Sequence, residues 1–455
     1  MQLSTLRSFA LPAALAAALS GCAAGAPSSS LPYMSSTTSL ARLDATGASK
    51  IKHIVYIVQE NRSFDNMFYG YPGADTRTYG YTSDNTKVML KPVSLAAYYV
   101  IDHSADAMFA ACNAPAGDLP GTHCRMNGFN HEENENGPPN VKYPEYVYVP
   151  HKESQPYFDM AHQGVLADRM FQSQLDESFT AHQYVIAAQA AWSVNLPYGL
   201  WGCEQKGVTI ATITKMRTYG PPESACFDYQ TLGDELDNAH LSWKFYASQY
   251  GSASSGDGGT WSSYQAVSHI YHGPDWKKDV ISPNWKFITD VRAGKLANFT
   301  WITPVCNDSD HVNCPDGYGP SWVSALVNTV GESPFWNSTA IFIQWDDWGG
   351  LYDHVAPAYL DRDSLGFRVP LVIMSPYAIA GTVSHTHYET ASVLRFAENL
   401  WGLGQLAPAD RRANSPADAF NFSQTPRKFI KIAAPLPPKF FMHQFPSDYF
   451  APDYE

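Results

Sequence analysis

The chain has 455 residues, of which 45% are hydrophobic and 14% aromatic, so it can build a large core and is not a disordered protein. Its formal net charge of −13 lacks the basic footprint of a nucleic-acid-binding protein, and we expect no nucleic acid among its partners. This charge does not exclude an anionic small substrate, because a bound metal ion can reverse the field of a site locally.

The first segment, residues 1–21, has the features of an export signal peptide. Arg7 precedes an apolar core that is too short to span a bilayer, and this core ends in Leu-Ser-Gly before Cys22. The ending resembles the lipobox of bacterial lipoproteins, in which the cysteine is lipidated; a plain secretory peptide is the alternative. The Ser/Ala/Pro-rich residues 22–48 are predicted to be a lipid-anchored tether. We therefore expect an exported protein, periplasmic or at the cell surface, that is anchored to a membrane through Cys22.

The remaining residues, 49–455, are predicted to form a single domain in which strands alternate with helices. Apolar runs typical of buried strands lie at residues 52–59, 241–247, 299–305, 340–345 and 368–375. Helical patterns lie at residues 229–240, 321–333 and 388–403. This alternation predicts an α/β fold, a three-layer sandwich with a mostly parallel central sheet. Long loop or cap insertions are expected at 70–150 and 246–300, and a surface-wrapping tail at 404–455.

Six cysteines remain once Cys22 is set aside, and an even number in an exported chain indicates disulfide bonds. Their short spacings make three local bonds the simplest pairing: Cys112–Cys124, Cys203–Cys226 and Cys306–Cys314. Sequence alone leaves other pairings open. A zinc site built from these cysteines is the less favoured alternative, because the chain has no CxxC pair.

Two of the predicted strands end on adjacent polar residues. Glu60 and Asn61 follow the first strand, and Asp346 and Asp347 follow the fourth. If the two strands are neighbours in the sheet, these four side chains can converge at one edge of it. Such an acidic cluster is costly without a cation, and its oxygen atoms suit one divalent ion such as Mg²⁺, Ca²⁺, Mn²⁺ or Zn²⁺. An ordinary exposed acidic turn is the alternative for either pair.

Histidines and hydroxyls supply the other candidate site residues. Acids flank His103, His311 and His354, and these acids could orient the imidazoles toward an anionic oxygen; loop or core positions are the alternative. Ser178 and Thr180 precede an apolar helical run, where a hydroxyl can face an anion or can simply cap the helix. The chain has no GxSxG elbow, which disfavours a serine hydrolase that carries this elbow. It also has no P-loop, which disfavours an NTPase.

Several segments, in order along the chain, resemble the bacterial phosphoesterase family that includes non-specific phospholipases C and an acid phosphatase. QENRSFDNMFYGYPG resembles the ENRSFD motif of this family, and WDDWGGLYDHVAP is similar to its C-terminal acidic motif. ESFTAHQYVIAAQ is similar to the nucleophile region, although Ala181-His182-Gln183 replaces the Pro-Asn-Arg of the family. The resemblance spans residues 50–402 and implies an alkaline-phosphatase-like fold.

The resemblance also implies roles for the candidate residues. The four strand-end residues would bind one metal ion, and Thr180 would be the nucleophile, with Ser178 as the alternative. The three acid-flanked histidines would contact phosphate or assist the leaving group, and His269 would match a further family histidine. The implied activity is metal-dependent hydrolysis of small phosphate esters through a phospho-threonine intermediate, as in an acid phosphatase. The alternatives are a phospholipase C that cleaves phosphatidylcholine-type phosphodiesters and, from another class, a surface-anchored binding protein with an inactive site.

Overall fold

The computed structural model describes residues 47–199, 201–248 and 261–444. The predicted signal peptide, Cys22 and most of the predicted tether lie outside these residues, so the boundaries of those segments stay predictions. Among the described residues, no helix combines the length and the apolar character that a bilayer span needs.

A mixed eight-stranded sheet forms the centre of the described chain, in the strand order β14-β13-β15-β1-β16-β17-β8-β18. Its strands are β1 (His53–Gln59), β8 (Val165–Ala167), β13 (Trp243–Tyr246), β14 (Val280–Ile281), β15 (Phe299–Ile302), β16 (Thr339–Trp345), β17 (Leu371–Met374) and β18 (Thr382–Ser384). Neighbouring strands are parallel, except that β17 runs antiparallel to both β16 and β8. The central strands are buried along their length, as expected for a sheet that is covered on both faces.

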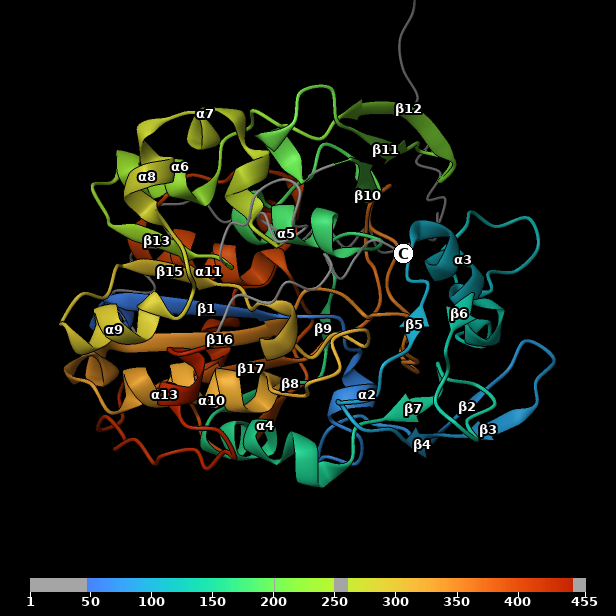
Figure 1. Cartoon of the computed structure of the whole chain (residues 1–455), viewed down its shortest axis with the longest axis horizontal. Coiled ribbons are helices and arrows are strands. Elements are labelled where there is room, and N and C mark those ends of the chain that lie inside the picture. The colour runs from blue at the N-terminus through green and yellow to red at the C-terminus, as the bar shows by residue number, and fades with distance from the viewer. Residues whose placement is uncertain (1–46, 200, 249–260, 445–455) are drawn as a thin grey trace, which may run out of the picture. The chain divides into compact units, whose positions relative to one another are not determined.

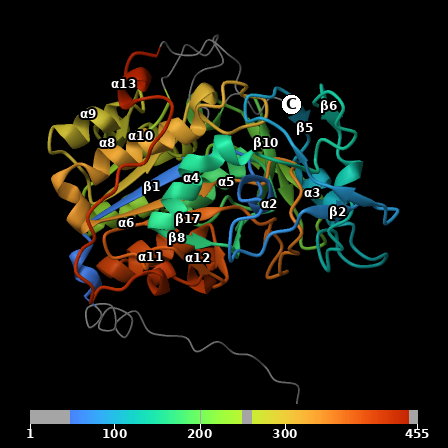
Figure 2. The ribbon, with the colours of Figure 1, turned by 90° about the horizontal axis from the view of Figure 1, so that it is seen from below.

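Helices cover both faces of this sheet. They include α4 (His151–Gln163), α5 (Ser178–Ala187), α6 (Leu232–Asn238), α9 (Lys286–Arg292), α10 (Gly319–Gly331), α11 (Ala391–Trp401) and α12 (Pro408–Arg412). Figure 2 shows α9 and α10 on one side of the sheet and α11 and α12 on the other. Helix α4 contacts α10 and β17, whereas α5 contacts α11. The predicted three-layer α/β sandwich with a mostly parallel sheet is confirmed.

Smaller elements gather beyond the C-terminal end of β1 (Figure 1). They are α2 (Phe64–Met67), α3 (Ala105–Cys112), β2 (Tyr79–Tyr81), β3 (Lys87–Met89), β4 (Lys91–Pro92), β5 (Val100–Ile101), β6 (Asn134–Glu135) and β7 (Val147–Tyr148). A three-stranded antiparallel sheet is built from β10 (Ser193–Tyr198), β11 (Thr209–Ile213) and β12 (Tyr219–Ser224). The other strands and α-helices of the described residues are β9 (Met170–Phe171), β19 (Tyr388–Glu389), α7 (Ser268–Tyr271), α8 (Pro274–Asp279) and α13 (Pro438–Phe441).

The five predicted strands correspond to β1, β13, β15, β16 and β17, and the three predicted helices to α6, α10 and α11. All three predicted disulfides are present: Cys112–Cys124, Cys203–Cys226 and Cys306–Cys314. The disulfide of residues 306–314 closes the loop that carries His311, so it limits the positions that this histidine can take.

Candidate active site

The C-terminal ends of β1 and β16 lie side by side at one edge of the sheet. Their parallel register pairs Gln59 with Trp345, so Glu60 and Asp346 follow at the same level. The backbone N–H of Asp346 donates to Gln59 O at 2.9 Å, and that of Asn61 donates to Asp346 Oδ1 at 3.1 Å. The side chains of both strand ends are buried. The two strands are neighbours in the sheet, which is the condition on which the convergence of their polar ends depended.

Glycines let the chain after β16 fold closely over the end of β1. Gly349 has φ of +60°, and a Cβ at this position would lie 2.3 Å from Asn61 O. Gly350 has φ of +70°, and its Cβ would lie 2.2 Å from Ile101 Cγ2. Asn61 itself takes a φ of +49°, which costs energy for a residue with a side chain. The glycine pair of the WDDWGG segment therefore allows a turn that other residues would block.

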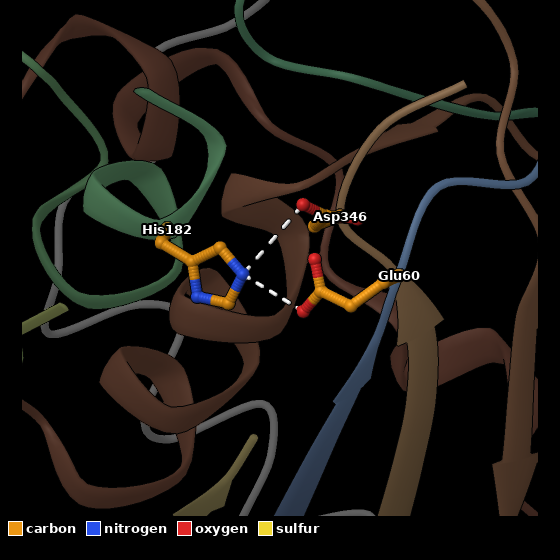
Figure 3. Close-up of side chains that lie close together, drawn as sticks. All are labelled: Glu60, His182 and Asp346. Carbon is orange, nitrogen blue, oxygen red and sulfur yellow. Dashed lines mark hydrogen bonds and ion pairs between the residues drawn. The ribbon is translucent and has the colours of Figure 1, made fainter. Parts of the chain in front are cut away.

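His182 joins the two strand ends from helix α5. Its Nε2 lies 3.0 Å from Glu60 Oε1 and 3.6 Å from Asp346 Oδ2 (Figure 3). All three side chains are fully buried, and one potential ligand atom from each lies within 4.8 Å of the other two. Sequence reasoning noted His182 only as a departure from the family motif. Its spacing of one helical turn from Ser178 is the signal that could have found it, because residues i and i+4 share a helix face.

Ser178 is the first residue of α5, and its hydroxyl lies among the strand-end side chains. Ser178 Oγ accepts a hydrogen bond from Asn61 Nδ2 at 3.1 Å. It lies 3.2 Å from Asp347 Oδ2 and 3.5 Å from Glu60 Oε2, so it can donate its proton to either carboxylate. The free backbone N–H groups and dipole of a helix N-terminus favour an anion at this position. We call Glu60, Asn61, Ser178, His182, Asp346 and Asp347 the strand-end cluster.

Thr180 points elsewhere on the same helix. Its hydroxyl lies 3.4 Å from Ser193 Oγ, at the start of β10. Two residues along a helix correspond to a turn of about 200°, so the side chains of Ser178 and Thr180 leave on different faces. Of the two hydroxyls that the sequence left open, Ser178 is the one that hydrogen-bonds Asn61 and Asp347.

His103 and His311 lie beside the strand-end cluster. His103 Nδ1 donates to Ile101 O at 3.0 Å, which leaves Nε2 facing Asn61 Nδ2 at 3.1 Å and Asp347 Oδ2 at 3.9 Å. The His311 ring centroid is 5.9 Å from that of His103. Both histidines are buried.

The loop that carries His311 is attached directly to β1. Gln59 Nε2 donates to Asp308 O at 3.0 Å, and the backbone N–H of Asp310 donates to Gln59 Oε1 at 3.1 Å. Tyr157 and Trp345 donate to Asp310 Oδ2 at 2.6 and 3.0 Å. Burial raises the pKa of Asp310 to about 6, although these two hydrogen bonds oppose the rise. The last strand residue before Glu60 thus fixes the loop on which His311 lies.

His354 belongs to a second, largely buried group, which we call the arginine cluster: Asp65, the partly exposed Asp75, Asp353, His354 and Arg368. His354 Nδ1 lies 2.5 Å from Asp65 Oδ2, and its Nε2 lies 3.0 Å from Asp75 Oδ1. Arg368 donates to both carboxylate oxygens of Asp353, from Nε at 3.0 Å to Oδ1 and from Nη2 at 3.1 Å to Oδ2. Burial lowers the pKa of His354, but the hydrogen bond and charge of Asp65 outweigh it, so the pKa is raised.

His269 lies outside both clusters. Its Nδ1 is 2.7 Å from Asp228 Oδ1 and its Nε2 is 3.0 Å from Asp234 Oδ1, in the first turn of α6. Its side chain is 38% exposed, unlike the buried histidines of the site. These two acids raise the pKa of His269 against the opposing effect of its partial burial.

Comparison with known proteins identifies the family of the chain. Residues 51–404 match the sequence model of the Phosphoesterase family. The chain belongs to the Phosphoesterase family. The resemblance predicted from the ENRSFD and WDDWGGLYDHV segments is therefore confirmed.

Relatives of this phosphoesterase include proteins named phospholipase C. It is 24% identical over 392 residues to the non-hemolytic phospholipase C of Burkholderia pseudomallei (strain K96243), which covers 76% of this chain and 55% of the relative. It is 25% identical over 433 residues to the non-specific phospholipase C1 of Arabidopsis thaliana, covering 83% of this chain and 72% of the relative. The chain thus spans about half the length of the Burkholderia protein.

Among solved structures, a Vibrio parahaemolyticus protein described as belonging to the alkaline phosphatase superfamily is similar to this phosphoesterase. The two share 10% sequence identity, with a TM-score of 0.37. The match covers 86% of this chain and 79% of the other chain.

Proposed function

We propose that the chain hydrolyses phosphate esters with Ser178 as the nucleophile, at a divalent metal ion held by the oxygen atoms of Glu60, Asn61, Asp346 and Asp347. The observation that carries the proposal is the position of Ser178 Oγ. It lies at the N-terminus of α5 and within 3.5 Å of carboxylate oxygens from both strand ends, Glu60 and Asp347. Membership of the Phosphoesterase family, with relatives named phospholipase C, supports a phosphoric ester hydrolase.

A divalent cation fits the donor atoms of the strand-end cluster. Asn61 Oδ1 and Asp346 Oδ2 are buried and make no hydrogen bond within the described part of the chain. Buried polar atoms in that condition are costly unless an ion or water satisfies them. Glu60 and Asp347 add further carboxylate oxygens at the same edge. When bound, the metal would lower the pKa of a coordinated hydroxyl and offset the charge of the phosphate; Mg²⁺, Ca²⁺, Mn²⁺ and Zn²⁺ are the candidates.

Different residues of the chain would act as nucleophile and as general acid. The Ser178 hydroxyl gives its proton to a neighbouring carboxylate, and its oxygen attacks phosphorus as the bond to the leaving oxygen breaks. His103 binds Ile101 O through Nδ1, so in its protonated form it can donate the Nε2 proton to the leaving oxygen. Water then cleaves the phosphoserine and restores Ser178. Thr180, the nucleophile that the family resemblance implies, would need its side chain to leave Ser193.

His311 has a proposed role on the substrate side of the same site. Its ring lies beside that of His103, and its loop is bound to Gln59 at the end of β1. We assign it to contact with the phosphate oxygens. His354 and His269, by contrast, are held by the acids around them, and we propose a structural role for both.

The proposed substrates are small phosphate monoesters, as for an acid phosphatase. Phosphatidylcholine-type phosphodiesters are the second candidate, and the phospholipase C names of the relatives favour it. The test compares hydrolysis of a chromogenic phosphate monoester with that of phosphatidylcholine vesicles, using Asp346→Asn as the matched control. Hydrolysis of either substrate by the wild type alone supports the proposal and selects the substrate class. Equal, background-level turnover of both substrates by both proteins would contradict it and favour a binding protein.

We also propose that the protein is exported and anchored through a lipid on Cys22, on the strength of the signal-like residues 1–21. Cys22→Ala should move the protein from the membrane fraction to the soluble fraction of the cell. Unchanged fractionation would remove the anchoring proposal and leave the hydrolase proposal intact.

A further inference from the structure

We infer that His182 is a nitrogen ligand of the metal ion, which makes this site selective for zinc-like ions over calcium and magnesium. The inference rests on the proposed function, because it concerns the same cation. It adds a residue and a metal class that the strand-end carboxylates do not specify.

The positions of the donor atoms support ligation. His182 Nε2 lies 3.0 Å from Glu60 Oε1 and 3.6 Å from Asp346 Oδ2, and Figure 3 shows this nitrogen facing both carboxylates. Donor atoms about 2.0–2.1 Å from a tetrahedral zinc ion lie about 3.3 Å from one another. The observed separations bracket that value. A small shift of the side chains would admit an ion between the three donors.

The packing around His182 holds its ring in this orientation. The ring lies nearly parallel to that of Trp261, with centroids 6.5 Å apart and an interplanar angle of 12°. Trp201 approaches it edge-on, at 6.2 Å and 77°. Its position one turn after Ser178 places both side chains on the face of α5 that meets the strand ends. A ligand fixed by packing loses little conformational entropy when the ion binds.

The donor set then decides which ion binds best. Calcium and magnesium prefer all-oxygen sites, whereas an imidazole nitrogen suits zinc and the later first-row transition metals. His182 can instead act as a hydrogen-bond donor to Glu60, which requires the proton on Nε2. Ligation requires the Nε2 lone pair and the proton on Nδ1. The two roles exclude each other in one molecule, so a binding measurement can separate them.

The test is calorimetric titration of chelator-treated protein with ZnCl₂ and, separately, with CaCl₂. In the wild type we expect zinc to bind about 100-fold more tightly than calcium. In His182→Asn we expect zinc affinity to fall by about 100-fold and calcium affinity to change by less than about 3-fold. His311→Asn, which removes a buried histidine next to the cluster, should keep the wild-type zinc affinity. Circular dichroism checks that each variant is folded, and His182→Gln replaces any variant that is not.

X-ray absorption at the zinc edge gives a readout that does not depend on any variant. The inference predicts one imidazole shell around zinc in the wild type. An all-oxygen shell would overturn it, as would a loss of zinc and calcium affinity to the same extent in His182→Asn. Failure of the proposed function looks different: the wild type would bind neither ion, and Asp346→Asn would behave like the wild type.

Discussion

The strand-end cluster and the arginine cluster contain similar types of residue, but the negative charges of their acids are compensated differently. Each holds buried acids and a histidine, and each has three potential ligand atoms close enough to hold a metal ion. In the arginine cluster, Arg368 supplies a permanent positive charge, donates to Asp353 from both Nε and Nη2 and reaches Asp65 at 3.4 Å. The side chain of Asp346 accepts a hydrogen bond from the backbone N–H of Asn61 and lies near His182 Nε2.

This difference is our reason for proposing a structural ion-pair group in one cluster and a cation site in the other. Removing one partner of a buried ion pair leaves an uncompensated charge, so the arginine cluster is held together by its own charges. The strand-end cluster leaves oxygens of Asn61 and Asp346 without a hydrogen bond in the described structure. Both clusters bring buried acids together, and Arg368 lies in one of them.

The largest expected effect tests whether the strand-end cluster performs the chemistry. Ser178→Ala should reduce kcat by about 10⁴-fold, because the attacking oxygen is lost while binding groups remain. Thr180→Ala is the matched control on the same helix and should change kcat by less than about 10-fold. Steady-state kinetics on the better substrate, with thermal unfolding to check the fold, measures both. The reverse ranking would return the nucleophile to Thr180.

The next prediction tests the charge balance through stability. Arg368→Met should lower the free energy of unfolding by about 3–5 kcal/mol, because Asp65 and Asp353 remain buried without their cation. Asp346→Asn removes one acid from the other cluster and should leave the metal-free protein as stable as the wild type or more so. Urea unfolding of both variants after chelation gives the comparison. Similar losses in the two variants would mean that the clusters do not differ in charge balance.

Metal removal should affect the strand-end cluster alone. With free metal at about 100 times its Kd, binding should add about 2.7 kcal/mol to the free energy of unfolding of the wild type. Chelation should remove this increment together with the activity, and metal addition should restore both. In Asp346→Asn, chelation should change neither quantity. An increment of the same size in that variant would place the metal elsewhere.

The smallest effect is a pH dependence in the arginine cluster. The pKa of His354 is raised above its ordinary value of 6.5 by Asp65, against the effect of burial. A raised histidine pKa gives a stabilisation that is fully present below about pH 6.5 and is lost as the pH rises through the folded-state pKa. The stability difference between the wild type and His354→Gln should therefore be largest at acidic pH and shrink toward alkaline pH. A difference that does not change with pH would show that His354 acts through packing alone.

The main strands could be predicted from the sequence because they are apolar on both faces. The runs at 52–59 and 340–345 predicted both strands and the polar residues that end them. The pairing of these two strands, on which the approach of Glu60 to Asp346 depends, is seen only in the sheet. Strands β8 and β18 have three residues each, which is too short for a recognisable period. Their place in the sheet comes from pairing with β17 and with each other.

The assignment of residues to one cluster or the other was harder to predict from the sequence, because each motif contributes residues to both clusters. The ENRSFD segment supplies Glu60 and Asn61 to the strand-end cluster and Asp65 to the arginine cluster. The WDDWGGLYDH segment likewise supplies residues to both clusters, and its His354 lies beside Arg368. The choice between Ser178 and Thr180, and the approach of His182, depend on the phase of α5 against the sheet. The sequence does not specify the rotation of α5 about its axis relative to the sheet.

The most direct test of the difference between the two clusters is an anomalous diffraction map from crystals grown with ZnCl₂ or MnCl₂. We predict a strong metal peak in the strand-end cluster, among Glu60, Asn61 and Asp346, and no peak in the arginine cluster. A peak among Asp65, Asp353 and His354, or no peak at the ends of β1 and β16, would contradict it.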